Sequence, residues 1–271
     1  MKYLNKHAIV TGGSSGIGKA VAILLAIEGA NLTLIARDDR KLAVAKEEIE
    51  AAVDSCVRVL TVSADVANRQ EITTAIEQAI AQLGTPELLV TSAGMAHPGY
   101  FDRIPLEVFE QTMMVNYFGS LYSIKAVLPT METNGRGNIV LISSGAGLIG
   151  IYGYSAYCPS KFALRGLAES LRGELKPKGI GMTIVYPPDT DTPQLAAENK
   201  IKPPETQKIT ATAKTWTPQA VAQQILRGVE QNKFAIAPGM ELTILNKLHS
   251  LLAPVLNWHF DRLVKNIDNK K

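Results

Sequence analysis

Short apolar runs alternate with longer amphipathic segments along most of the chain. The runs have strand length and are rich in β-branched residues; they cover residues 7–11, 31–37, 57–62, 87–91, 138–144, 181–186 and 234–237. The segments between them have helix composition and cover residues 19–28, 41–53, 68–83, 106–130, 155–177 and 218–230. Strands that alternate with helices predict βαβ units. The expected fold class is therefore α/β, a doubly wound parallel sheet with helices on both faces.

Two stretches depart from this alternation. Pro187-Pro-Asp-Thr-Asp-Thr-Pro193 begins a polar stretch with few apolar anchors that extends to residue 215. Because it follows the carboxyl end of a strand, where ligands bind in open α/β sheets, we interpret residues 187–215 as a lid. Residues 239–271 are rich in apolar side chains and predict helices interrupted at Pro254. We therefore predict one domain over residues 1–238, followed by a C-terminal helical extension.

Composition and charge exclude several classes of function. The 271 residues are 46% apolar and 20% charged, as in an ordinary soluble globular protein, and the formal net charge of +3 is too small to indicate a nucleic-acid surface. Cys56 and Cys158 form no C-x-x-C motif and the four histidines lack ligand spacing, so we expect no disulfide and no metal site. Without a signal-like segment or an apolar run of about eighteen residues, we expect a cytoplasmic protein.

A glycine-rich turn, Gly12-Gly-Ser-Ser-Gly-Ile-Gly18, lies between the first predicted strand and helix. In this context glycines let a phosphate approach the backbone, and the helix N-terminus offers free N–H groups. A mononucleotide P-loop is disfavoured because Ala20, which follows Lys19, lacks the hydroxyl that would hold magnesium. The turn instead favours dinucleotide binding, although its first gap is one residue wider than in the general fingerprint. The candidate contacts are Gly12, Ser14, Ser15, Gly16, Ile17 and Gly18.

The end of the second predicted strand indicates which dinucleotide binds. In this kind of fold the residue there faces the adenosine ribose, and an acidic side chain would select NAD. Arg37 occupies the position, with Lys41 one helical turn further on, and two cations suit a 2′-phosphate. The sequence therefore predicts NADP(H). Asp65 follows the third strand, where it either binds the adenine edge or caps the next helix.

Proton chemistry is indicated by Tyr157 and Lys161, which lie four residues apart in a predicted helix and so share one face. A phenol has an ordinary pKa of about 10, and a neighbouring ammonium favours its ionised form. Ser144, at the end of an apolar strand, can aim a hydroxyl at the same substrate oxygen. By itself a Tyr-x-x-x-Lys pair is more often a half-buried phenol beside a solvated lysine.

Five separated elements occur together: Thr11-Gly-x-x-x-Gly-x-Gly18, Thr91-Ser-Ala-Gly94, Asn116, Ser144 and Tyr157-x-x-x-Lys161. In order and spacing, the chain resembles the classical short-chain dehydrogenase/reductases over about residues 5–240, which implies a Rossmann fold. The segments 34–37, 160–168 and 186–193 are most similar to family members that reduce a long-chain sphingoid ketone. Thr91 stands where the family usually has asparagine, and Pro188 replaces a usual glycine. The leading membrane segment frequent in that group is not expected here.

The resemblance implies a role for each matching residue. NADPH would deliver a hydride to a ketone carbon while Tyr157 gives a proton to the developing alkoxide, and Ser144 would bind the carbonyl oxygen. Ser143 takes that role if the strand register differs by one. Lys161 would lower the pKa of Tyr157 and bind the nicotinamide ribose, and Asn116 would hold a helix distortion and a water. Cofactor contacts are further implied at Ala93, Gly94, Tyr157, Lys161, Pro187, Thr190 and Thr192.

The substrate is predicted less directly than the reaction. The predicted lid and the apolar C-terminus suit a long-chain keto lipid such as 3-ketosphinganine. Apolar residues recur at helical spacing over residues 240–267, together with Trp258. This pattern favours packing against the domain or against a second subunit of a homo-oligomer, and it is also typical of peripheral contact with the cytoplasmic face of a membrane. Two other functions stay open. One is reduction of a 3-oxoacyl thioester or another ketone, and the other is a non-catalytic NADP-binding regulator.

Overall fold

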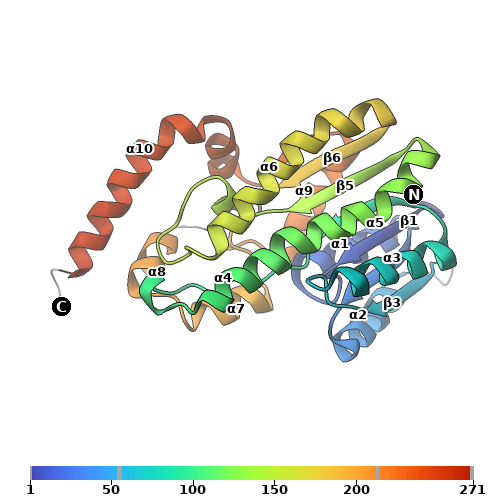
Figure 1. The fold of residues 1–271 in the computed structure, drawn as a ribbon, viewed down its shortest axis with the longest axis horizontal. Coiled ribbons are helices and arrows are strands. Elements are labelled where there is room, and N and C mark those ends of the chain that lie inside the picture. The colour runs from blue at the N-terminus through green and yellow to red at the C-terminus, as the bar shows by residue number, and fades with distance from the viewer. Residues whose placement is uncertain (1, 54–56, 212–213, 269–271) are drawn as a thin grey trace.

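The computed structural model describes residues 2–53, 57–211 and 214–268. In this part of the chain, seven strands form one parallel sheet in the order β3-β2-β1-β4-β5-β6-β7 (Figure 1). The strands are β1 (His7–Thr11), β2 (Asn31–Ala36), β3 (Val59–Ser63), β4 (Pro86–Thr91), β5 (Gly137–Ile142), β6 (Ile180–Val185) and β7 (Ala235–Ile236). The predicted doubly wound parallel sheet is therefore confirmed.

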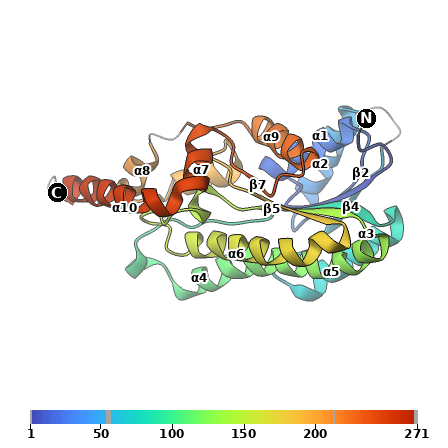
Figure 2. The same cartoon turned by 90° about the horizontal axis from the view of Figure 1, so that it is seen from above.

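Helices cover both faces of the sheet, as Figure 2 shows from the edge. One layer contains α1 (Gly16–Ile27), α2 (Asp39–Ala51) and α9 (Pro218–Glu230). The opposite layer contains α3 (Arg69–Leu83), α4 (Leu106–Met113), α5 (Gly119–Asn134) and α6 (Tyr157–Leu175). Three further helices, α7 (Pro193–Asn199), α8 (Pro204–Thr210) and α10 (Met240–Asp268), lie on the side of the molecule where the strands end, and α10 extends furthest outward.

The core consists of two apolar layers because successive side chains of a buried strand point to opposite faces. In β1, Ala8 and Val10 pack with α1 and α9, whereas Ile9 packs with α3 and α5 on the other face. All three side chains are at most 1% exposed. Burial on both faces explains why the strands appear in the sequence as continuous apolar runs rather than as an alternating pattern.

The order of the strands determines where a ligand can bind. The chain winds from β1 outward to β3 and then returns to β4 on the other side of β1, so a crevice opens between the carboxyl ends of β1 and β4. The turn after β1 and the segment after β4 meet there. A Cβ atom on Gly12 would lie 2.6 Å from the backbone nitrogen of Ala93, so this close approach requires glycine.

Three local features differ from the pattern predicted from the sequence. A π-helical turn, Met114–Phe118, interrupts the helix predicted over residues 106–130; it contains Asn116, where the resemblance implies a helix distortion. The weakly patterned residues 187–215 contain α7 and α8, which are too short to show a clear period. The last helix was predicted to break at Pro254, but it continues through that proline and departs from helical geometry at Leu248 (φ −124°, ψ 16°). Cys56 lies outside the described residues.

Candidate active site

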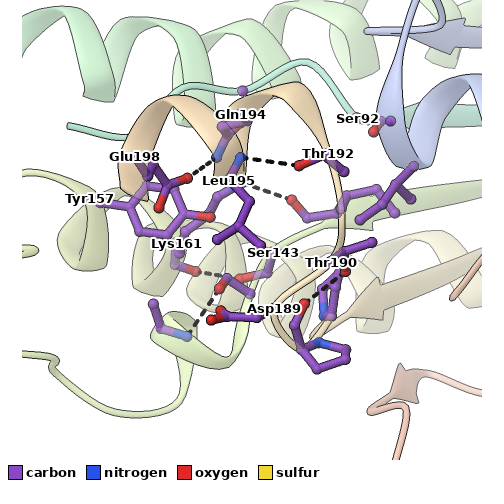
Figure 3. Close-up of a pocket in the computed structure, with 18 of the residues that line it drawn as sticks. Ser92, Ser143, Tyr157, Lys161, Asp189, Thr190, Thr192, Gln194, Leu195 and Glu198 are labelled. Atoms are coloured by element: carbon purple, nitrogen blue, oxygen red, sulfur yellow. Dashed lines mark hydrogen bonds between the residues drawn. The ribbon is translucent and has the colours of Figure 1, made fainter. Parts of the chain in front are cut away.

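A cavity of about 160 Å³, here called the central cavity, lies at the carboxyl edge of the sheet. It brings together side chains that are far apart in the sequence (Figure 3). The predicted site residues that line it are Ser15, Gly16, Ile17, Gly94, Ser144, Tyr157, Lys161, Pro187, Thr190 and Thr192. The glycine-rich turn, the reactive pair on α6 and the start of the predicted lid therefore share one hollow.

Tyr157 and Lys161 occupy the first turn and a half of α6. The ammonium of Lys161 donates a hydrogen bond of 3.0 Å to the carbonyl oxygen of Ile142, at the end of β5. Its nitrogen lies 5.5 Å from the centroid of the Tyr157 ring, and the lysine is only 5% exposed. Lys161 is therefore a buried cation fixed beside the phenol, not a solvated surface charge.

The two serines after β5 have different partners. Ser143 is buried and donates a hydrogen bond of 3.0 Å from its hydroxyl to the backbone oxygen of Lys161, so it fastens α6 to the sheet. Ser144 accepts a hydrogen bond of 3.2 Å from the backbone nitrogen of Ala146, and its hydroxyl is hydrogen-bonded to Tyr157. The geometry thus places Ser144, rather than Ser143, beside the phenol.

The surroundings of Tyr157 raise its pKa above the ordinary value. Burial is the largest cause, the charge of Glu198 is the second, and the hydrogen bond with Ser144 acts in the opposite direction. The resemblance implies that Lys161 lowers the pKa of Tyr157. In this structure the protein's own groups raise that pKa instead. Burial in turn lowers the pKa of Lys161 to about 8, which leaves it mostly cationic at neutral pH. The phenol is therefore protonated at neutral pH.

Asn116 lies in the π-helical turn and is completely buried. Its side-chain oxygen accepts a hydrogen bond of 2.9 Å from the backbone nitrogen of Met95, and its amide group donates to the Met95 oxygen at 3.0 Å and to the Ser160 hydroxyl at 2.8 Å. Asn116 therefore connects the distorted helix, the segment after β4 and α6. Ser160 in turn donates a hydrogen bond of 2.7 Å to the backbone oxygen of Tyr157. Asn116 itself lines none of the cavities described here.

A second cavity, of about 190 Å³ and here called the Arg37 cavity, lies on the other side of the glycine-rich turn. The predicted contacts that line it are Gly12, Ser14, Arg37, Lys41, Asp65, Ala93 and Gly94. The guanidinium of Arg37 lies 3.9 Å from the carboxylate of Asp65, and the ammonium of Lys41 lies 3.8 Å from that of Asp38. Pairs this long and this exposed contribute little, so both cations remain open to a phosphate.

The turn itself fits the phosphates of a dinucleotide. Gly16 has a φ of +54°, and a Cβ atom on Gly18 would overlap the carbonyl oxygen of Gly12, so both positions require glycine. Ser15 is the N-cap of α1 but makes no side-chain capping bond, which leaves the first N–H groups of the helix for an anion. Gly18 thus packs the turn and lines neither cavity.

Two of the remaining predictions can be compared with the structure. Asn68, not Asp65, caps α3; the Asp65 carboxylate accepts a bond of 2.9 Å from the Ala67 nitrogen in the turn before it. Thr91 stands where the family usually has asparagine, and its buried hydroxyl has no hydrogen-bond partner among the described residues. The hydroxyl therefore does not replace the hydrogen bond that an asparagine side chain would make at this position.

Sequence reasoning missed several residues that line these cavities: Asp38, Ser92, Tyr154, Asp189, Gln194 and Glu198. Asp189, Gln194 and Glu198 lie in the stretch whose pattern was too weak to predict α7. Their polarity was visible in the sequence, but no spacing rule connects that stretch to the site on α6.

The comparisons with known proteins agree with this fold. The family model described as "short chain dehydrogenase" matches residues 6–202, and the chain belongs to this family. It is therefore an oxidoreductase of the short-chain dehydrogenase type. As a solved structure with a similar fold, a short-chain dehydrogenase/reductase from Burkholderia phymatum in complex with NAD has a TM-score of 0.81 and 23% identity, and the match covers 93% of this chain and 97% of that one.

Relatives of known activity are more similar in sequence. The chain is 44% identical to the 3-dehydrosphinganine reductase of Danio rerio, over 94% of this chain and 77% of that protein. It is also 44% identical to the 3-ketodihydrosphingosine reductase of Bos taurus, over 92% of this chain and 76% of that protein. The corresponding reductase of Dictyostelium discoideum is 41% identical, over 98% of this chain and 84% of that protein.

Proposed function

We propose that this protein reduces 3-ketodihydrosphingosine to sphinganine with NADPH. The observation that carries the proposal is that Ser144, Tyr157 and Lys161 line one cavity in a chain that shares 44% identity with reductases of that name. The reaction transfers a hydride to the ketone carbon and a proton to its oxygen. NADPH supplies the hydride when bound.

The chain's own residues would handle the proton. The Ser144 hydroxyl would hold the ketone oxygen beside the phenol of Tyr157, which is protonated at neutral pH. Tyr157 would then give its proton to the developing alkoxide. Lys161, cationic and fixed by Ile142, would hold the nicotinamide ribose and stabilise the phenolate after transfer. Asn116 would keep α6 in position through Ser160 and supply a place for a water.

The preference for NADPH rests on the Arg37 cavity. Arg37 directly follows β2 and its side chain is 66% exposed, so the guanidinium can form charge-assisted bonds to a 2′-phosphate. Lys41 adds a second cation to the same hollow. Asp38 and Asp65 are the carboxylates near these cations, and each is only loosely paired.

The alkyl chain would occupy a third cavity of about 360 Å³, here called the apolar cavity, which shares Ser144 with the central cavity. The residues that give it its apolar character are Ile149, Ile151, Ile209, Trp216, Leu242, Leu245 and Phe260. The last three come from α10, so the C-terminal helix builds part of this wall. A ketone held at Ser144 could therefore extend a long saturated chain along α10.

The direct test is NADPH oxidation with 3-ketodihydrosphingosine, 3-oxoacyl thioesters and simple long-chain ketones. We expect the sphingoid ketone to have the highest kcat/KM. A higher value for a 3-oxoacyl thioester would assign the protein to that alternative substrate class. No turnover with any ketone, in a protein that binds NADPH, would favour the non-catalytic regulator.

We also propose that α10 contacts a membrane surface. Among the described residues, no helix is long and apolar enough to cross a membrane. Large apolar side chains on α10 are nevertheless exposed, including Leu251 at 75%, Val255 at 62% and Trp258 at 62%. The helix also projects away from the sheet (Figure 1). Such a face suits an interface between headgroups and acyl chains, where a sphingoid ketone would be collected.

Liposome co-sedimentation tests this contact. We expect the full-length protein to pellet with vesicles, whereas a variant with Leu251, Val255 and Trp258 changed to serine should stay in the supernatant with an unchanged circular dichroism spectrum. We also propose a homo-oligomer, so the alternative partner for this face of α10 is a second copy of the chain. The face would be assigned to oligomerisation if the full-length protein does not bind vesicles and light scattering shows that the triple variant is monomeric where the full-length protein is not.

A further inference from the structure

A buried carboxylate, that of Glu198, faces the reaction centre from α7. Glu198 is 8% exposed and lines the central cavity together with Ser144, Tyr157 and Lys161. Figure 3 shows its side chain beside the ring of Tyr157. The proton transfer described above makes no use of this group. A buried carboxylate with no role and no counter-charge would be unfavourable, so its surroundings are informative.

Two neutral donors hold the Glu198 side chain in place. The hydroxyl of Tyr154 donates to one carboxylate oxygen at 2.6 Å, and the side-chain amide of Gln194 donates to the other at 2.9 Å. These bonds orient the carboxylate but bring no positive charge. Within the described ranges of the chain, no lysine, arginine or histidine forms an ion pair with Glu198. Neutral donors therefore hold the Glu198 carboxylate in a fixed orientation, and it has no ion-pair partner among the described side chains.

The other charged side chains that line the central cavity have partners of their own. The charge of Glu198 raises the pKa of Lys161, opposing the effect of burial. The ammonium nevertheless donates its hydrogen bond to the backbone oxygen of Ile142 on the sheet. Asp189 is the other carboxylate that lines the cavity, and the charge of Lys202 acts on it and opposes the effect of burial on its pKa. Glu198 differs from Asp189 because, among the described side chains, its carboxylate is bonded only by the neutral donors of Tyr154 and Gln194.

We propose that Glu198 binds a protonated primary amine on the carbon next to the substrate's ketone. This inference rests on the proposed function, because in 3-ketodihydrosphingosine the amine-bearing carbon is bonded directly to the ketone carbon. A ketone oxygen held by Ser144 and Tyr157 brings this ammonium into the cavity that Glu198 lines. Simple ketones and 3-oxoacyl thioesters have no such cation. The carboxylate therefore selects an α-amino ketone over ketones of equal length.

The test compares two substrates in Glu198→Gln, which keeps the shape of the side chain and removes its charge. One substrate is 3-ketodihydrosphingosine and the other is the hydroxy ketone of the same chain length without the amine. For the amino ketone we expect kcat/KM to fall roughly ten- to a hundredfold, the range of one charge-assisted hydrogen bond. The fall should lie mainly in KM, because the ion pair exists before and during the reaction. For the amine-free ketone, kcat/KM should stay at or above the wild-type value, since the charge of Glu198 raises the pKa of the proton donor.

Glu205→Gln is the matched control. Glu205 is also a buried glutamate in the stretch between β6 and α9, is 2% exposed, and accepts a bond of 3.0 Å from the hydroxyl of Tyr100, but it lines none of the three cavities. This variant should treat both ketones as the wild type does. Equal losses on both ketones in a folded Glu198→Gln variant, or no loss on the amino ketone, would overturn the inference alone. A wild-type protein that reduces the amine-free ketone and not 3-ketodihydrosphingosine would overturn the proposed function as well.

Discussion

Changing Tyr157 to phenylalanine is expected to lower kcat by a factor of roughly 10²–10⁴, the usual contribution of a general acid. The substitution removes one hydroxyl and keeps the ring that packs 5.6 Å from the ring of Tyr154, centroid to centroid. The cofactor cavities and the buried lysine stay intact, so the dissociation constant for NADPH should change little. Initial rates and fluorescence titration with NADPH measure the two quantities separately.

Lys161→Ala provides the comparison for that variant. It removes a buried cation that is hydrogen-bonded to the end of β5, so it should reduce both turnover and NADPH binding. If Tyr157 had only a structural role, the result would be different. Tyr157→Phe would then lower the melting temperature and leave the kcat of the folded fraction unchanged. Retention of more than a few per cent of kcat by a folded Tyr157→Phe variant would mean that another group donates the proton.

Changing Arg37 to alanine is expected to remove most of the preference for NADPH over NADH. A charge-assisted contact to a phosphate contributes about 1.5–3 kcal/mol, so the ratio of the two dissociation constants should fall roughly ten- to a hundredfold. NADH affinity should change little because its ribose carries no phosphate at that position. Isothermal titration of both cofactors, at one ionic strength, measures the ratio.

Arg40→Ala is the control for this measurement. Arg40 is an exposed arginine three residues further along the chain, at the start of α2, and it does not line the Arg37 cavity. Arg40→Ala and Arg37→Ala each remove one positive charge from the same region. Any general loss of electrostatic attraction for the cofactor should therefore appear in both variants. Equal affinities of the wild-type protein for NADPH and NADH would contradict the role assigned to Arg37.

Much of the fold could be predicted from the sequence because its signals are local. A strand buried on both faces needs a continuous apolar run, as in β1, and a tight phosphate turn needs glycine at Gly12 and Gly16, whose φ angles are positive. Tyr157 and Lys161 could likewise be paired in advance because helical spacing alone brings them to one face. The alternation of strands and helices then predicted the doubly wound sheet, and the resemblance to the short-chain dehydrogenase/reductases implied the reaction class.

Other features depend on contacts between segments that are distant in the sequence, and only the tertiary structure decided them. The pKa of Tyr157 rises rather than falls because burial and Glu198 outweigh its hydrogen bond with Ser144. The long helix continues past Pro254 and kinks at Leu248 instead, although proline is the stronger local signal. Glu198 belongs to the site because the tertiary structure places α7 at the central cavity, where its carboxylate lies beside the phenol of Tyr157. A carboxylate's chemistry is set by its neighbours, and no pattern along the chain determines which neighbours those are.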